Sequence, residues 1–207
     1  MDDKVLLKVE NISKSFDGSR VLDNVSFTVA AGEAVAILGA NGAGKTTLLR
    51  IVTTLLKPDS GQVFFDGHPI SRADLDCIGY LPEERGLYRH AAAGPQVVYL
   101  AQLKGMRRRE AKVSAEGWFS RLGISGWWSR PVARLSKGMQ QKLQFIATVA
   151  HNPRLVILDE PFSGFDEENS AMLRREILSL KAAGAAIILS THNLQAAAEL
   201  CDKTIRL

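Results

Sequence analysis

The sequence predicts an α/β fold with a mixed or parallel central sheet, a small antiparallel β subdomain near the start of the chain and an inserted α-helical lobe. Short apolar runs at residues 34–38, 155–158 and 185–189 indicate buried strands, and a helical segment follows each of them. Before residue 30, apolar runs alternate with turns, which indicates a small antiparallel sheet. Between about residues 85 and 134 the pattern becomes helical.

Length and composition predict one domain. We divide the 207 residues into an α/β core, residues 1–85 and 135–207, and a helical subdomain, residues 86–134. Hydrophobic residues make up 46% and charged residues 23%, the profile of a soluble globular protein with a sizeable core. No apolar run approaches the ~18 residues that span a bilayer, and the acidic residues 1–4 do not begin a signal peptide. Cys77 and Cys201 form no CxxC pair and are interpreted as buried or incidental thiols, which predicts a reducing, cytoplasmic location.

A phosphate-binding loop is predicted between the strand at residues 34–38 and the helix that follows. Residues 39–47 fit the pattern G-x-x-x-x-G-K-[ST]. Its glycines let the backbone wrap a polyphosphate, with N–H groups pointing inward at the positive end of a helix. Lys45 adds a point charge for the outer phosphates, and the Thr46 hydroxyl can ligate Mg²⁺. The predicted nucleotide-binding residues of the loop are Gly39, Asn41, Gly42, Gly44, Lys45, Thr46 and Thr47.

Further strands and turns are predicted on either side of this loop. Phe16 precedes the turn at Asp17-Gly18, where its ring could stack on a base, although a single Phe more often lies in a core. The helix after the loop is expected to end near Lys57, before the turn at residues 58–61. Strands are predicted at residues 62–65 and 77–81, and the second ends at Pro82-Glu83-Glu84.

The inserted lobe carries two features that could have contacted nucleic acid. Trp127-Trp128 is interpreted as lobe core and not as a stacking site. The net charge of +4 could favour an anionic membrane surface or nucleic acid, but the densest basic run, residues 107–109, has no aromatic residues interleaved. We interpret this run as a solvated helix face, and we expect no nucleic-acid partner.

The acids of the site are predicted in the last third of the chain. A helix begins after the N-cap Ser136, with an apolar stripe that ends before Asn152-Pro153. The next apolar strand ends in Asp159 and Glu160, where the first acid can hold the water shell of Mg²⁺ and the second can orient an attacking water. His192 follows the strand at residues 185–189, at the ligand edge of a parallel sheet. An amphipathic helix, residues 166–183, is expected to bury Met172, Leu173, Ile177, Leu178 and Leu180 on one side.

These ordered motifs resemble the ATP-binding subunits of ABC transporters over nearly the whole chain. The resemblance implies that Phe16 stacks on adenine, that residues 163–166 form the D-loop and that His192 is the switch histidine. Glu83 stands where the family usually has a glutamine that touches Mg²⁺. Residues 135–139 stand where the signature usually reads LSGGQ; Ser136 and Gly138 remain, whereas Lys137 and Met139 replace a glycine and a glutamine. Asp159 is then the Mg²⁺-side acid and Glu160 the general base.

The resemblance also implies partners and a reaction. ATP and Mg²⁺ would bind between two such subunits, in a homodimer or a heterodimer, and hydrolysis would drive an integral membrane permease from the inner face of the cell membrane. The motif details are similar to those of the export branch related to sodium and drug efflux ATPases. The alternatives are a soluble ABC-type ATPase of DNA repair or translation and a non-enzymatic ATP-gated module, against which Glu160 argues. Residues 204–207 have the pattern of a strand that begins there, so we expect the cassette to be truncated at its C-terminus.

Overall fold

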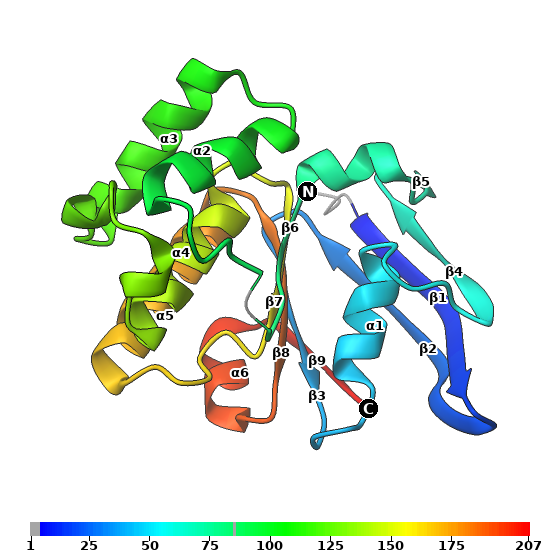
Figure 1. Cartoon of the computed structure of the whole chain (residues 1–207). Helices are drawn as coiled ribbons and strands as arrows, with labels where there is room; N and C mark the ends of the chain where they lie inside the picture. Colours follow the sequence, from blue (N-terminus) through cyan, green and yellow to red (C-terminus); the bar gives the residue numbers. More distant parts are fainter. Residues whose placement is uncertain (1–4, 85) are drawn as a thin grey trace.

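The computed structural model describes residues 5–84 and 86–207 and consists of two sheets with helices packed around them (Figure 1). The predictions made for residues 1–4 and for a boundary at Arg85 lie outside the described residues. The division into a core and a helical subdomain stays a prediction.

The first sheet is antiparallel and comes from the start of the chain. Its strand order is β2-β1-β4-β5, in which β1 and β2 form a long hairpin. Asp17 and Gly18 both have positive φ, 49° and 81°, so the hairpin turns tightly at the position the sequence predicts. The strands are β1 Val5–Phe16, β2 Ser19–Ala30, β4 Ser60–Phe65 and β5 His68–Pro69.

The second sheet is parallel in every described pairing, with the order β6-β7-β8-β3-β9. Every residue of β3, β7 and β8 is buried, as expected for strands covered on both faces. The strands are β3 Ala34–Leu38, β6 Ile78–Leu81, β7 Leu155–Asp159, β8 Ala186–Thr191 and β9 Lys203–Arg206. The strand predicted to begin at residue 204 therefore exists and pairs with β3.

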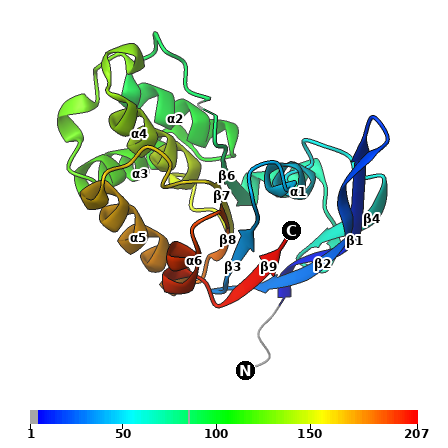
Figure 2. The same ribbon diagram turned by 90° about the horizontal axis from the view of Figure 1, so that it is seen from below.

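Alternate residues of the central strands pack on opposite faces of this sheet. Leu155 and Ile157 join a cluster with helix α1 and the antiparallel sheet, whereas Val156 and Leu158 join a cluster with α4 and α5. Figure 2 shows α1 held between the two sheets, with α4, α5 and α6 on the other face. The helices are α1 Lys45–Val52, α4 Lys137–Val149, α5 Glu167–Ala182 and α6 Leu194–Leu200.

A helical portion lies between β6 and α4 in the sequence. It contains α2 Ala93–Leu103 and α3 Arg108–Arg121, and short 3₁₀ turns at Ser125–Trp127 and Val132–Arg134, with another at Arg72–Cys77 before β6. Trp128 packs edge-on against Phe119 with ring centroids 5.0 Å apart. A Cβ at Gly94 would lie 2.1 Å from this indole, so the helix α2 meets Trp128 through a bare backbone. Both tryptophans pack against the core, as their interpretation as lobe core requires.

Two sequence expectations are wrong in detail. Helix α1 ends at Val52 and not near Lys57, because Thr54 takes a left-handed φ of 58° and turns the chain away. Leu178 is 42% exposed, because it lies off the stripe formed by Leu173 and Ile177. Phe16, by contrast, is 44% exposed, which leaves its ring accessible, as its predicted stacking on a base requires.

The described part of the chain contains no helix that is both long and apolar enough to cross a membrane. Both cysteines are free and half-buried, and burial raises the pKa of the Cys201 thiol to about 11. Cys201 is therefore a poor nucleophile, which agrees with its interpretation as an incidental thiol.

Candidate functional site

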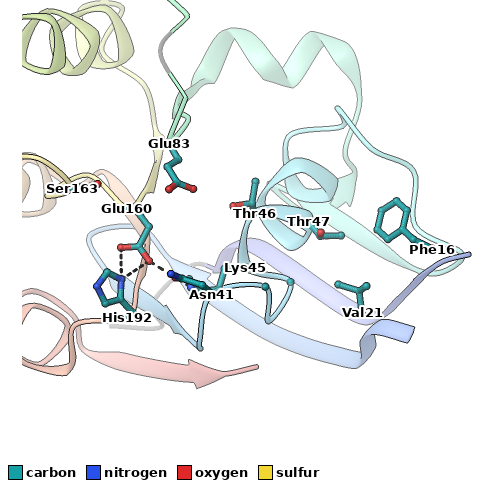
Figure 3. A pocket seen from close by; sticks show the side chains of 12 residues that line it. Phe16, Val21, Asn41, Lys45, Thr46, Thr47, Glu83, Glu160, Ser163 and His192 are labelled. Carbon is teal, nitrogen blue, oxygen red and sulfur yellow. Dashed lines mark hydrogen bonds and ion pairs between the residues drawn. The ribbon is translucent and has the colours of Figure 1, made fainter. Parts of the chain in front are cut away.

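A cavity of about 620 Å³ lies beside the start of α1, at the carboxyl ends of the parallel strands (Figure 3). This edge is where parallel α/β sheets bind their ligands. It is lined by Phe16, Val21, Asn41, Gly42, Gly44, Lys45, Thr46, Thr47, Glu83, Glu160, Ser163 and His192. Residues from both sheets and from the ends of β6, β7 and β8 therefore meet in one place.

The loop between β3 and α1 forms the floor of the cavity. Gly42 and Gly44 have φ values of 82° and 95°, a region that favours glycine. A Cβ at Gly44 would lie 2.9 Å from Val21 Cγ1, so a larger residue is excluded there. This backbone leads into the N-terminus of α1 at Lys45, where free N–H groups can bind an anion.

Lys45 is held inside this loop. Its side chain is only 7% exposed, and Nζ donates to the carbonyl oxygens of Gly39 at 2.9 Å and Ala40 at 3.1 Å. Nζ also lies 3.5 Å from Glu160 Oε1. The ammonium group is thus fixed between the backbone of this loop and Glu160, the acid that directly follows β7.

Asp159 ends β7 and is fully buried behind the cavity. Its Oδ2 accepts a hydrogen bond from Thr46 Oγ1 at 2.8 Å, and its Oδ1 accepts one from Ser190 Oγ. Burial raises the pKa of the neighbouring Tyr80 to about 12, and the charge of Asp159 contributes to this rise. Tyr80 therefore stays neutral beside the acid.

The oxygen ligands fit a magnesium ion that is bound mainly through a phosphate-bearing substrate. Thr46, Glu83 and Asp159 line a second hollow, of about 450 Å³. The described residues offer no group of three or more His, Cys, Asp or Glu that could hold a metal by itself. Mg²⁺ in nucleotide sites usually takes one or two protein ligands and completes its shell with phosphate oxygens and water.

Glu160 and His192 lie side by side in the cavity (Figure 3). His192 Nδ1 lies 3.1 Å from both Oε1 and Oε2 of Glu160. The glutamate side chain is 12% exposed and the histidine 66%, so the acid sits inside and the imidazole at the mouth. Glu160 has a positive φ of 47°, a strained conformation for a residue with a Cβ, and such strain clusters at functional sites.

Phe16 lies at the far rim of the same cavity, at the end of β1 and beside Val21. Lys14 Nζ is 5.5 Å from the centroid of the Phe16 ring. Asp59 accepts hydrogen bonds from Lys14 Nζ at 2.6 Å and from the Ser15 N–H at 2.7 Å, and the bond from Lys14 contributes most to lowering the pKa of Asp59. The end of β1 is thus held in place while the phenyl ring stays exposed.

The structure brings most of the predicted site residues together, but not all of them. Gly39 and Asp159 do not line the main cavity, although both contact residues that do. Ser136 and Gly138 do not line it either. Ser136 caps α4 instead, where its Oγ accepts from the Met139 N–H at 3.3 Å.

Sequence reasoning missed three residues of the site. Val21 and Ser163 line the cavity, and Ser190 binds Asp159. Ser163 belongs to a segment that the resemblance had already singled out. Ser190 precedes His192 by two residues, but its role depends on the pairing of β8 with β7, which the sequence does not state. Val21 carries no signal in the sequence.

The chain matches a family model described as "ABC transporter" over residues 22–163, and a second model, described as an AAA domain, over residues 129–198. An ABC transporter ATP-binding protein of Methanocaldococcus jannaschii is 46% identical over 98% of this chain and 74% of that protein. The protein YhaQ of Bacillus subtilis, named in the same way, is 42% identical over 95% of this chain and 66% of that protein. A Nod factor export ATP-binding protein of Sinorhizobium fredii is 35% identical over 96% of this chain and 59% of that protein.

The fold agrees with these matches. A solved structure titled as the ATP binding subunit of an ABC transporter superposes with a TM-score of 0.90 at 31% identity, over 98% of this chain and 85% of that one. The predicted fold class is therefore confirmed. The chain spans about two thirds of the length of the first curated relatives, with shares of 66%, 74% and 62%.

Proposed function

This chain belongs to the ATP-binding subunits of ABC transporters, an ATPase family, and we propose that it hydrolyses ATP with Mg²⁺ to drive a separate membrane permease. One observation carries the proposal. The Glu160 carboxylate lies 3.5 Å from Lys45 Nζ and 3.1 Å from His192 Nδ1, in a cavity that the phosphate loop also lines. Lys45, which can bind phosphate, and Glu160, which can act as a base, thus face the same cavity.

The residues divide the work of hydrolysis. The loop N–H groups and Lys45 bind the phosphates, and the exposed Phe16 ring is placed to stack on the adenine. Thr46, Asp159 and Glu83 would hold Mg²⁺, which neutralises charge on the phosphate oxygens when it is bound. Glu160 accepts a proton from the attacking water, and the hydrogen bond from His192 fixes the carboxylate in this direction.

The position of the signature segment supports a head-to-tail dimer. Ser136 and Gly138 stand at the N-terminus of α4, away from this chain's own cavity. A helix N-terminus with a hydroxyl and a bare glycine suits an anion, and Lys137 adds positive charge. In the proposed dimer these groups meet the γ-phosphate held by the phosphate loop of a second copy or a sister chain.

We place the permease contact at residues 83–96, between the core and the helical portion. A hollow of about 230 Å³ lies there, and its lining includes Leu87, Leu100, Leu103 and Ala147. Within this segment, Gln96 holds the backbone of Tyr88, since its Oε1 accepts from the Tyr88 N–H at 2.7 Å and its Nε2 donates to the Tyr88 carbonyl at 3.2 Å. This apolar groove with a polar rim suits a helix from a partner. We propose an exporter, peripheral on the cytoplasmic face of the membrane, because relatives named for export align with nearly the whole chain.

The change Glu160→Gln tests this function. It keeps the size of the side chain and removes the base, so ATP should still bind while turnover falls by about 10²–10⁴-fold. Because the bound ATP is not cleaved, ATP-bound dimers should accumulate in sedimentation runs. Glu168→Gln, an exposed position in the first turn of α5, is the matched control and should behave as wild type. A Glu160→Gln protein that stays monomeric with ATP, or that keeps its turnover, contradicts the proposal.

A further inference from the structure

Ser190 lies where the two strands that supply the acids and the histidine run side by side. The parallel register of β7 and β8 places Asp159 opposite Ser190. Both residues are fully buried. A buried hydroxyl needs hydrogen-bond partners, and both partners of this one belong to the site.

The Ser190 hydroxyl bonds to each of the two acidic residues. Its Oγ donates to Asp159 Oδ1 and accepts from the backbone N–H of Glu160 at 3.1 Å. The carbonyl oxygen of Ser190 also lies 3.2 Å from the same N–H. One residue of β8 therefore holds the side chain of the first acid and the backbone of the second.

The second of these bonds falls at the strained point of the backbone. Glu160 is the residue with a φ of 47°, and a backbone in this region persists only where its surroundings hold it. Ser190 holds its N–H, and His192, two residues further along the chain, holds its carboxylate at 3.1 Å. Both the backbone and the side chain of Glu160 are thus held by residues at, or directly after, the end of β8.

Asp159 is fixed in the same manner. Its Oδ2 accepts from Thr46 and its Oδ1 from Ser190, so each carboxylate oxygen has a hydroxyl donor. Loss of either donor would free the carboxylate to rotate. It would also leave a buried carboxylate oxygen of Asp159, a proposed Mg²⁺ ligand, without its hydrogen-bond donor, which is energetically unfavourable.

We infer that Ser190 is a positioning residue for hydrolysis, which sets Asp159 and Glu160 relative to each other. This inference rests on the proposed function, in which these two acids face Mg²⁺ and the attacking water. Ser190 is not among the residues that line the cavity, so it acts through the acids and not on the nucleotide. Its loss should lower turnover and leave ATP binding intact.

The first test compares Ser190→Ala with wild type in steady-state hydrolysis. We expect kcat to fall about tenfold, as for the loss of a buried hydrogen bond to a charged group, while KM for ATP changes less than about twofold. Ser190→Cys keeps a donor at the same position, although a weaker one on a somewhat larger atom, and should fall in between, which covers the case in which the alanine protein does not fold. Ser170→Ala, another buried serine, on α5, is the control and should turn over as wild type.

The second test is a double-mutant comparison in single-turnover assays. If Ser190 acts through Glu160, adding Ser190→Ala to Glu160→Gln should cost much less than the tenfold seen alone. A full tenfold loss in the Glu160→Gln background, a Ser190→Ala kcat equal to wild type, or a KM that rises as kcat falls would overturn the inference. A wild-type protein without ATP turnover would instead contradict the proposed function, so the two failures are distinguishable.

Discussion

The starts of α1 and α4 each present a helix N-terminus suited to an anion, but their surroundings differ. At α1, the ammonium of Lys45 is nearly buried and Glu160 lies within 3.5 Å of it. At α4, Ser136 is exposed, and the nearest atoms to a Cβ at Gly138 would be ring carbons of Phe165 at 3.9 Å and 4.0 Å. The first place is surrounded by its own chain. The start of α4 can also bind an anion, but its residues do not line this chain's own cavity. We therefore propose that it contacts the nucleotide held by a second subunit.

Mixing two inactive variants would sharpen this contrast most. Lys45→Ala removes the positive charge that faces the phosphates and should weaken ATP binding about 100-fold. Gly138→Asp puts a negative charge where the γ-phosphate of the other subunit would lie, in a place with room for a Cβ, and should abolish turnover without weakening ATP binding to the isolated chain. Each protein alone should be inactive.

In a mixed dimer, both defects fall in one composite site and the other site is intact. Mixing the two proteins should therefore restore measurable phosphate release. Lys57→Ala, an exposed lysine after α1, serves as the control for loss of a positive charge. Mixtures that stay inactive while sedimentation shows mixed dimers would mean that both helix ends act within one chain, and the comparison would fail.

A pH titration of stability tests the far end of α4. Burial first, and then the charge of Lys104, lowers the pKa of His151 from 6.5 to about 4. The unfolded chain therefore binds more protons between these values, so the free energy of unfolding should fall as pH drops through 6.5 towards 4. From pH 7 to pH 5 we expect a loss of about 2 kcal/mol in urea unfolding.

In His151→Gln this loss should shrink, whereas the exposed His90→Gln should keep it. An unchanged slope in His151→Gln would show that other groups carry the pH dependence. In either case the effect concerns the stability of the core beneath α4 and not the charge at its N-terminus.

The smallest expected effect is at Phe16, on the far rim of the main cavity. Phe16→Ala should weaken ATP binding about tenfold, the value of one base-stacking ring, and should leave the melting temperature unchanged because the ring is 44% exposed. Tyr99→Ala, a half-exposed aromatic on α2, should change neither. A Phe16→Ala protein that binds ATP as tightly as wild type does would remove Phe16 from the nucleotide site.

How much the sequence predicted follows the same division. The phosphate loop was predictable because residues 39–47 are consecutive and their glycines all serve to let the backbone wrap a polyphosphate. The buried strands were also predictable, since a parallel sheet covered on both faces needs continuous apolar runs. Ser190 was not, because its contact with Asp159 depends on the sheet order β7-β8, which local patterns do not encode. The early end of α1 was not predictable either, because it depends on a left-handed backbone at Thr54, and threonine rarely adopts that conformation.

The backbone of Glu160 has a consequence for the evolution and engineering of this chain. A residue with a Cβ at a φ of 47° costs of the order of 1 kcal/mol, which a glycine or an asparagine would largely avoid. If Glu160 acts as proposed, position 160 is one at which stability and activity favour different residues. A selection for heat resistance alone would favour replacing Glu160, the proposed general base, so any search for more stable versions of this subunit needs turnover as a second criterion.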